Sequence, residues 1–240
     1  MGTAIKAAFV TAFALGVMST TVEAVVITDC CDWASGWSFS SYGVAAGTAS
    51  ATVEGSGGNP GARLNITTVT PTVADIAYGT AVLTTSTQPA PVSGTPFTLS
   101  LDVLSGPGAF GQGQGIVLLV QQGTTVYAQL AVGATGFPVS PFTTQTFTGT
   151  FTPGAFARVI GSGPTLPVFD GSTPTQFGFA AGNSNSGTLT QYYDNFTLSI
   201  GGGGVALVAT PVPTLSQWAL ILLALGLGVL GTATAVRRHR

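Results

Sequence analysis

The stretch PFTLSLDVLSG, residues 96–106, decides the fold class of this chain. Apolar residues occupy every second position from Phe97 to Val103, and mostly polar residues fill the positions between them. Successive side chains of a β-strand point to opposite faces of the sheet, so this alternation predicts a strand with one buried face. The segment carries no apolar stripe at helical spacing.

The same two-residue period recurs along the chain. It is found in TTVYAQLAVG (124–133), TQTFTGTFT (144–152) and DNFTLSI (194–200). Glycine-rich segments separate the runs, among them GSGGNPGA (55–62), SGPGAFGQGQG (105–115) and AAGNSNSG (180–187). Many short strands with frequent turns predict an all-β sandwich or barrel over residues 25–200. Within it, IVLLVQQGTTVYAQLAV (116–132) is expected to form one hairpin near the centre of a sheet.

The N-terminus has the layout of a signal peptide. Lys6 precedes an apolar run of 11 residues, AAFVTAFALGV (7–17). Such a run is too short to cross a membrane as a helix but suits a signal-peptide core. Val22 and Ala24 occupy the positions that a signal peptidase recognises, so we expect residues 1–24 to be removed after Ala24. The alternative is a buried N-terminal helix.

Charge and cysteine content limit the partners of the exported part. Between residues 25 and 200 there are seven acids and two bases, a formal net charge of −5. A surface of that sign repels phosphate backbones, which disfavours nucleic-acid binding. Cys30 and Cys31 are adjacent and cannot join distant parts of the fold. They could form a strained vicinal disulfide, remain free thiols or bond to another chain.

The C-terminal segment is predicted to cross a membrane. GGGGVALVATPV (201–212) has the composition of a flexible tether. A helix start follows, with Thr214 as N-cap, Gln217 at capping-box spacing, and Pro213 and Trp218 at the staple positions. Trp218 to Val236 are 19 residues without charge, about 28 Å of helix, which is enough to span a bilayer. A basic cluster that stops transfer comes directly after: Arg237, Arg238 and Arg240.

This tail resembles the IPTL-CTERM sorting signal of Gram-negative bacteria, a relative in layout of the PEP-CTERM tail. The residues that carry the resemblance are Val212, Pro213, Thr214, Leu215, Ser216 and Trp218. Val212 stands where the family name has isoleucine. The resemblance implies that a membrane-embedded, exosortase-like enzyme reads the tail in the inner membrane. It also implies that the preceding domain is delivered to the cell surface or the extracellular polysaccharide matrix.

The exported part lacks the usual sets of catalytic residues. The one histidine of the chain is His239, in the tail, so Ser/His/Asp and Cys/His sites have no base between residues 25 and 200. Zinc-ligand spacings are missing as well. A glycosidase with two carboxylates is formally open, but no pair of acids is marked by its surroundings. We therefore expect a protein without enzymatic activity and without an obligatory cofactor.

Aromatic residues near both ends of the domain are candidates for glycan binding. Trp33, Trp37 and Tyr42 lie near its start, and Tyr192 and Tyr193 lie beside the last strand. Aromatic rings with polar tips suit sugar rings, although the same residues could pack the ends of the sandwich. The order GW, GGNPGARL and YYDNFTLSI is similar to jelly-roll sandwich modules of secreted bacterial proteins, several of which bind glycans.

Oxygen ligands for calcium are a further candidate site. They could come from Asp29 with Asp32 or from Asp194 with Asn195, although no EF-hand-like loop is present. The sequence thus predicts a jelly-roll-like β-sandwich with a structural or adhesive role in the cell envelope or matrix. The alternative is a glycan-binding module of the same architecture, with a polysaccharide as partner.

Overall fold

The computed structural model describes residues 24–29, 33–106, 114–131 and 141–201. The chain divides into two units, Met1–Gly203 and Gly204–Arg240, and every described residue belongs to the first.

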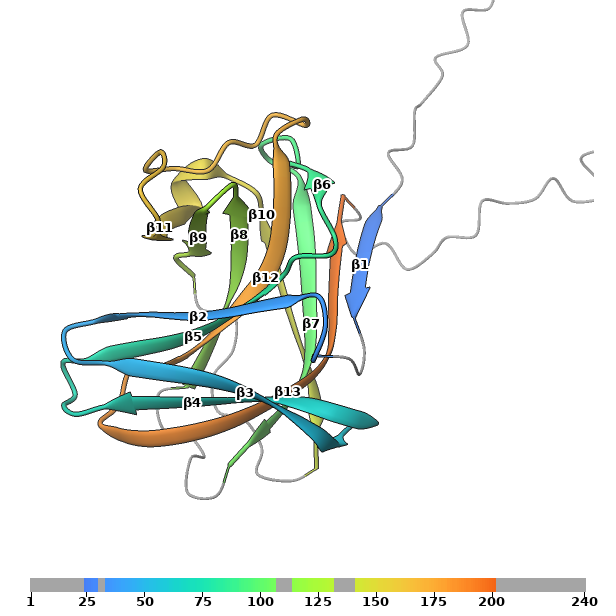
Figure 1. Cartoon of the computed structure of the whole chain (residues 1–240). Helices are drawn as coiled ribbons and strands as arrows, with labels where there is room; N and C mark the ends of the chain where they lie inside the picture. Colours follow the sequence, from blue (N-terminus) through green and yellow to red (C-terminus); the bar gives the residue numbers. More distant parts are fainter. Residues whose placement is uncertain (1–23, 30–32, 107–113, 132–140, 202–240) are drawn as a thin grey trace, which may run out of the picture. The chain divides into compact units, whose positions relative to one another are not determined.

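Strands form two sheets (Figure 1). Sheet A is six-stranded, with the order β10–β7–β13–β4–β3 and with β1 beside β13. Its strands are β1 (Val25–Asp29), β3 (Thr48–Gly58), β4 (Gly61–Thr70), β7 (Pro96–Ser105), β10 (Thr143–Thr150) and β13 (Gly187–Ile200). All of its pairings are antiparallel.

Sheet B is seven-stranded, with the order β11–β9–β8–β12–β5–β2 and with β6 beside β12. Its strands are β2 (Trp37–Val44), β5 (Ile76–Leu83), β6 (Gln88–Pro89), β8 (Gln114–Gln122), β9 (Thr125–Gln129), β11 (Phe156–Ile160) and β12 (Pro174–Asn183). A short 3₁₀ helix, Pro153–Ala155, precedes β11. The chain repeatedly crosses between the sheets, for example from β4 to β5 and from β12 to β13. The predicted all-β sandwich is confirmed.

The alternating segments of β7 and β13 face the interior as predicted. Phe97, Leu99, Leu101 and Val103 of β7 belong to the main core, which lies between the sheets. Apolar residues of β13 join them: Phe196, Leu198 and Ile200. Sheet B contributes its own alternate residues to this core, such as Ile116, Leu118 and Val120. Burying each large side chain contributes about 1.5–3 kcal/mol to folding, so this shared core holds the two sheets together.

The predicted central hairpin is also present. β8 pairs with β9 on one side and with β12 on the other, and Gly123 in the connecting turn has a positive φ of 60°. One detail differs from a simple inward pattern. Val126 and Ala128 of β9 pack in a second apolar cluster on the other face of sheet B, while Tyr127 enters the main core.

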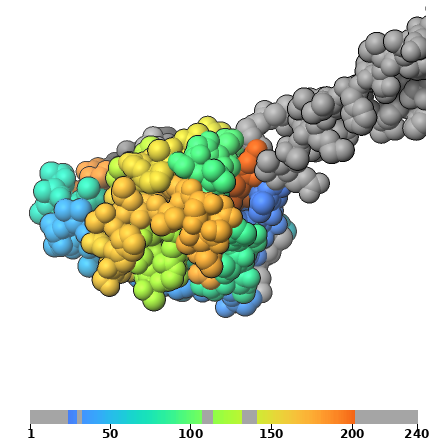
Figure 2. Space-filling model, turned by 90° about the horizontal axis from the view of Figure 1, so that it is seen from above, coloured from blue at the N-terminus to red at the C-terminus, as the bar shows by residue number. Residues whose placement is uncertain are grey.

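The two ends of the sandwich domain are paired with each other. β1 runs antiparallel to the end of β13, with Val25 opposite Ile200 and Asp29 opposite Phe196. The space-filling view shows β1 (blue) beside the last residues of β13 (orange-red) (Figure 2). The first strand is therefore paired with the last part of β13, whose other side is paired with β7.

Several predicted features lie outside the described residues. They are the signal peptide before Ala24, the cysteine pair, Asp32, the tether from residue 202 and the whole C-terminal tail. Ala24 itself is described; it is exposed and directly precedes β1. Across the described ranges, none of the helices has the length and apolar character needed to cross a membrane.

Candidate functional site

Two of the five aromatic residues that the sequence offers as glycan-binding candidates are enclosed by the core. Trp33 is 1% exposed and Tyr193 is 0% exposed. The Trp33 ring packs against Trp37, with ring centroids 4.7 Å apart, and the Tyr193 hydroxyl donates a hydrogen bond to Gln191. Neither ring has a face open to a ligand, so both residues have the packing role that the sequence left open as the alternative.

Two further candidates, Trp37 and Tyr192, are half-buried and already have partners. Trp37 packs edge-on against Phe196 at 5.2 Å, and its indole N–H donates a hydrogen bond to the Asp29 carboxylate. Tyr192 lies on the outer face of sheet A, where the Arg63 guanidinium sits 3.6 Å from its ring centroid. Arg63 also pairs with Glu54 at 2.6 Å. One face of the Tyr192 ring is therefore occupied by a cation of the protein itself.

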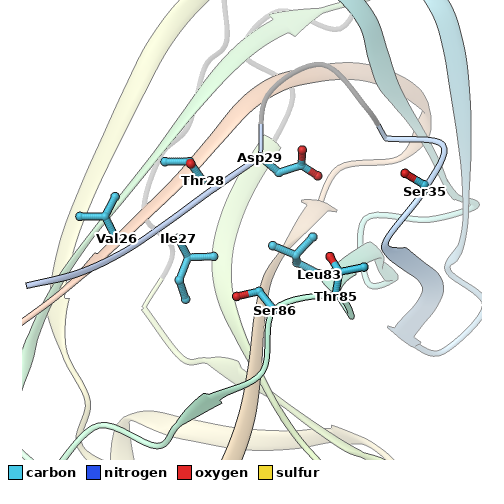
Figure 3. Close-up of a pocket in the computed structure, with 8 residues that line it drawn as sticks. All are labelled: Val26, Ile27, Thr28, Asp29, Ser35, Leu83, Thr85 and Ser86. Atoms are coloured by element: carbon cyan, nitrogen blue, oxygen red, sulfur yellow. The ribbon is translucent and has the colours of Figure 1, made fainter.

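Asp29 lines a cavity of about 350 Å³ at the edge of the sandwich (Figure 3). We call this cavity the edge pocket; its lining residues are Val26, Ile27, Thr28, Asp29, Ser35, Leu83, Thr85 and Ser86. They come from β1, from the turn before β2, and from the end of β5 with the two residues beyond Thr84.

Backbone contacts hold the two sides of the edge pocket together. Gly36 adopts a positive φ of 79°, and its carbonyl accepts a hydrogen bond of 2.7 Å from the Thr84 N–H. A Cβ at Gly36 would lie 2.8 Å from Thr85 Oγ1, so only glycine lets the turn approach this closely. The turn that carries Ser35 is thereby fixed beside Thr85.

The edge pocket has the groups of a polar binding site. The Asp29 carboxylate and the Ser35 hydroxyl point toward one another, and Thr85 and Ser86 add two further hydroxyls (Figure 3). Hydroxyls and a carboxylate can hydrogen-bond the hydroxyl groups of a small neutral ligand. Among the described lining residues Asp29 is the one acid, so the pocket lacks the second carboxylate that acid–base hydrolysis of a glycoside would need.

Asp194 and Asn195 join a different cluster, on the outer face of sheet A. Asp194 lies opposite Asp102 in the β13–β7 ladder, and both are buried. Asn59, at the β3–β4 turn, donates its side-chain amide to Asp102 at 3.0 Å and its backbone N–H to Asp194. Asn195 donates to the same Asp102 oxygen at 2.7 Å. Donors of the protein thus surround both carboxylates.

The two candidate calcium pairs lie in different places, and Asp32, the predicted partner of Asp29, lies outside the described residues. Asp29 lies in the edge pocket and bonds Trp37, whereas Asp194 and Asn195 bond Asn59 and Asp102. In the part of the chain that the structure describes, no group of three or more His, Cys, Asp or Glu side chains is placed to hold a metal ion.

Tyr78, which the sequence pattern did not single out, pairs with the candidate Tyr42 on the outer face of sheet B. The two residues lie opposite each other on β5 and β2, and their rings stack with centroids 4.8 Å apart and planes 10° apart. A strand of mainly small residues, IAYGTAVL, gave no sign that its tyrosine points away from the core. Only the β2–β5 register brings the two rings together.

Comparison with known proteins identifies the C-terminal segment. Residues 210–240 match the IPTL-CTERM motif. The match covers every motif residue that the sequence predicted, from Val212 to Trp218, together with the three arginines. No curated protein matches the chain.

The sandwich is similar to several solved carbohydrate-binding modules. The family 11 module of Clostridium thermocellum, in complex with a β-1,3-1,4-mixed-linked tetrasaccharide, is 13% identical; the match covers 73% of this chain and 94% of that chain, with a TM-score of 0.40. The xylan-binding module CBM15 is 15% identical, with 74% and 97% covered and a TM-score of 0.37. What each module binds is a property of that module.

Proposed function

We propose that this chain is an exported β-sandwich protein with a structural or adhesive role, delivered to the surface or extracellular matrix of a Gram-negative bacterium. The match of residues 210–240 to the IPTL-CTERM motif carries the proposal. The predicted signal peptide, residues 1–24, would start export, and the predicted helix from Trp218 to Val236 would hold the chain in the inner membrane during transit. An exosortase-like enzyme is the expected partner of the tail.

The character of the sandwich supports a structural role. The outer face of sheet A carries rows of threonine and serine, such as Ser50, Thr67 and Thr190, which are aligned across β3, β4 and β13. Thr67 and Thr190 share a hydrogen bond of 3.3 Å. The buried pair Asp102 and Asp194 is enclosed by hydrogen-bond donors, and the edge pocket has a single carboxylate, so neither offers the paired acid and base of a hydrolase.

The sorting proposal is tested by changing the motif without changing the apolar helix. In the full chain, Pro213→Ala combined with Leu215→Ala should leave the protein in the inner membrane, while the wild type reaches the surface or medium. A Leu222→Ile variant, which keeps the helix apolar, should behave as the wild type. Surface delivery of the motif variant at the wild-type level would contradict the proposal.

A second candidate function is glycan binding, which the polar lining of the edge pocket favours. Its hydroxyls and carboxylate suit the hydroxyl groups of a saccharide, and its volume of about 350 Å³ admits a small one. The test is affinity electrophoresis of the full chain in detergent through gels that contain a polysaccharide. Retardation in a neutral polysaccharide gel would support this function, and unchanged migration in every gel would contradict it.

A further inference from the structure

The outer face of sheet B carries an apolar cluster that the sandwich core does not need. Val117 and Leu119 of β8 point away from the main core and pack with Val82, Val126, Ala128 and Ala180. The outer face of an antiparallel sheet is ordinarily polar, because it meets water. Here the cluster is buried, since its residues are at most 6% exposed and Tyr42, Tyr78, Val159 and Ile160 pack against it.

A stacked pair of tyrosines forms one wall of a groove on this face. Tyr78 lies so close to Gly182, its neighbour on β12, that a Cβ at Gly182 would collide with the phenol ring. Tyr42, on the edge strand β2, then stacks on Tyr78. Because Gly182 has no side chain, the Tyr78 ring can occupy this space and Tyr42 can stack on it.

Residues of β8, β9 and β11, and Leu130 just after β9, complete the groove on the same face of sheet B. The cavity is about 170 Å³ and is lined by Tyr42, Tyr78, Val117, Ala128, Gln129, Leu130, Ala157 and Val159. We call it the tyrosine groove. Val117 and Ala128 are buried, whereas Leu130 is 64% exposed. The groove is therefore open at Leu130.

The two phenol hydroxyls of the groove have no partner within the described part of the protein. The hydroxyls of Tyr42 and Tyr78 make no hydrogen bond with another described residue. The side-chain amide of Gln129 points the other way, toward Gly149 of sheet A. Burial raises the pKa of the Tyr42 hydroxyl, with a further rise from the nearby Tyr78, and burial also raises the pKa of Tyr78. Both phenols are therefore neutral at physiological pH and can donate and accept hydrogen bonds.

We propose that the tyrosine groove binds an uncharged polysaccharide, through a sugar ring whose flat C–H face packs on the apolar lining and whose hydroxyls bond the hydroxyls of Tyr42 and Tyr78. An apolar partner would leave the two phenol hydroxyls unpaired. An anionic glycan would find no cation among the lining residues and a domain of net charge −5. This inference rests on the second proposed function and assigns it to a different face from the edge pocket.

The experiment compares variants of the full chain in detergent by affinity electrophoresis. The probes are two neutral glucans, laminarin and mixed-linkage β-glucan, and the anionic polysaccharide alginate. Leu130→Glu changes an exposed wall residue of the groove, and Leu166→Glu is its matched control, since Leu166 is 45% exposed and does not line the groove. Tyr42→Phe and Tyr78→Phe each remove one hydroxyl of the groove and keep the aromatic ring. Thr85→Val with Ser86→Ala removes two hydroxyls of the edge pocket.

The wild type is expected to bind at least one neutral glucan and not alginate. Leu130→Glu should weaken that binding about tenfold or more, and Tyr42→Phe and Tyr78→Phe should each weaken it severalfold. Leu166→Glu and the edge-pocket variant should bind as the wild type. Thermal unfolding of each variant confirms that the fold is kept.

The other outcomes separate the two proposals. If only the edge-pocket variant loses binding, glycan binding stands and its assignment to the tyrosine groove is overturned. Preferential binding of alginate would also overturn the inference, because the groove has no group to pair with uronate. If the wild type binds none of the glucans, glycan binding and the tyrosine groove fall together.

Discussion

The single residue Gly182, which has no side chain, determines how the aromatic rings lie on the outer face of sheet B. A Cβ at this position would overlap the Tyr78 ring, which in turn supports Tyr42. The stack of two aromatic rings on the outer face of sheet B thus depends on a glycine two strands away from Tyr42.

Gly182→Ala should therefore displace Tyr78 and destabilise the sandwich. Overpacking of a well-filled site costs about 1–3 kcal/mol. The matched control is Gly55→Ala in β3, where nothing lies within 4 Å of the added Cβ and little change is expected. Chemical denaturation followed by fluorescence measures both variants. Equal unfolding free energies for the two would contradict the close packing of Gly182 against Tyr78.

The Asp170 carboxyl should make the stability of the fold depend on pH. It accepts backbone N–H groups of Thr173 and Ser172, each at 2.8 Å, and these bonds lower its pKa to about 2 from an ordinary value of 3.8. A carboxyl whose pKa is lower in the folded state stabilises the fold above its unfolded pKa, and that contribution is lost as the pH falls toward 2.

Between pH 4 and pH 2 the wild type should lose more stability than an Asp170→Asn variant, since the amide does not titrate. The measurement is the denaturation midpoint of both proteins at pH 5, 4, 3 and 2.5. The difference between them should be constant from pH 5 upward and shrink below pH 4. A difference that does not change with pH would show that the Asp170 bonds do not form.

The sequence predicts which face of a sheet a side chain occupies only where apolar and polar residues alternate clearly. Phe97 and Leu99 follow a strict alternation and are buried as expected. The aromatic residues Trp33 and Trp37 have no such pattern around them, because they lie in and just after a turn. Whether a ring packs or faces solvent there depends on partners from distant strands, such as Phe179 and Phe196.

At the scale of elements, the β3–β4 hairpin also depends on partners from distant strands. The segment GSGGNPGA predicts a turn, and Gly61 has the positive φ of 89° expected of a turn glycine. The turn then folds over the outer face of sheet A, where Asn59 bonds Asp102 on β7 and Asp194 on β13. No local pattern relates residue 59 to residues 102 and 194, so this clamp could not be predicted from the sequence.

Asn59→Ala tests the clamp. It removes one of the three side-chain donors to the Asp102 carboxylate, the others being Asn195 and Thr144. Hydrogen bonds to charged groups contribute about 1.5–3 kcal/mol, so the variant should be destabilised by about that amount. Ser100→Ala, on the same strand and facing Thr146 at 3.5 Å, is the control and should stay within about 0.5 kcal/mol of the wild type. Equal stability of the two variants would contradict the clamp.

β8 explains why the second apolar cluster was not foreseen. Its segment GIVLLV is apolar at every position after the glycine, so no two-residue period shows which side chains face the core. Ile116 and Leu118 enter the main core, while Val117 and Leu119 form the cluster on the opposite face. A continuous apolar run predicts a strand buried on both faces, but only the neighbouring strands show what covers the second face.

At the scale of the whole molecule, the first strand of the sandwich domain is paired with the end of the last strand. Val25, the first residue after the predicted cleavage site, lies opposite Ile200, the last residue before the predicted tether. Removal of the signal peptide would leave β1 paired and complete, because every residue of β1 follows Ala24. The sandwich thus suits a domain that is processed at its N-terminus and carries its sorting segment behind the last strand.

The most direct test follows the two sides of the tail in the native host. One epitope is placed in the tether, between residues 202 and 210, and another after Arg240, and the cells are fractionated. The account predicts that the tether epitope reaches the surface or the medium while the C-terminal epitope is lost from it. If both epitopes stay together in the inner membrane, the segment from Trp218 to Val236 is a permanent anchor and the sorting proposal is contradicted.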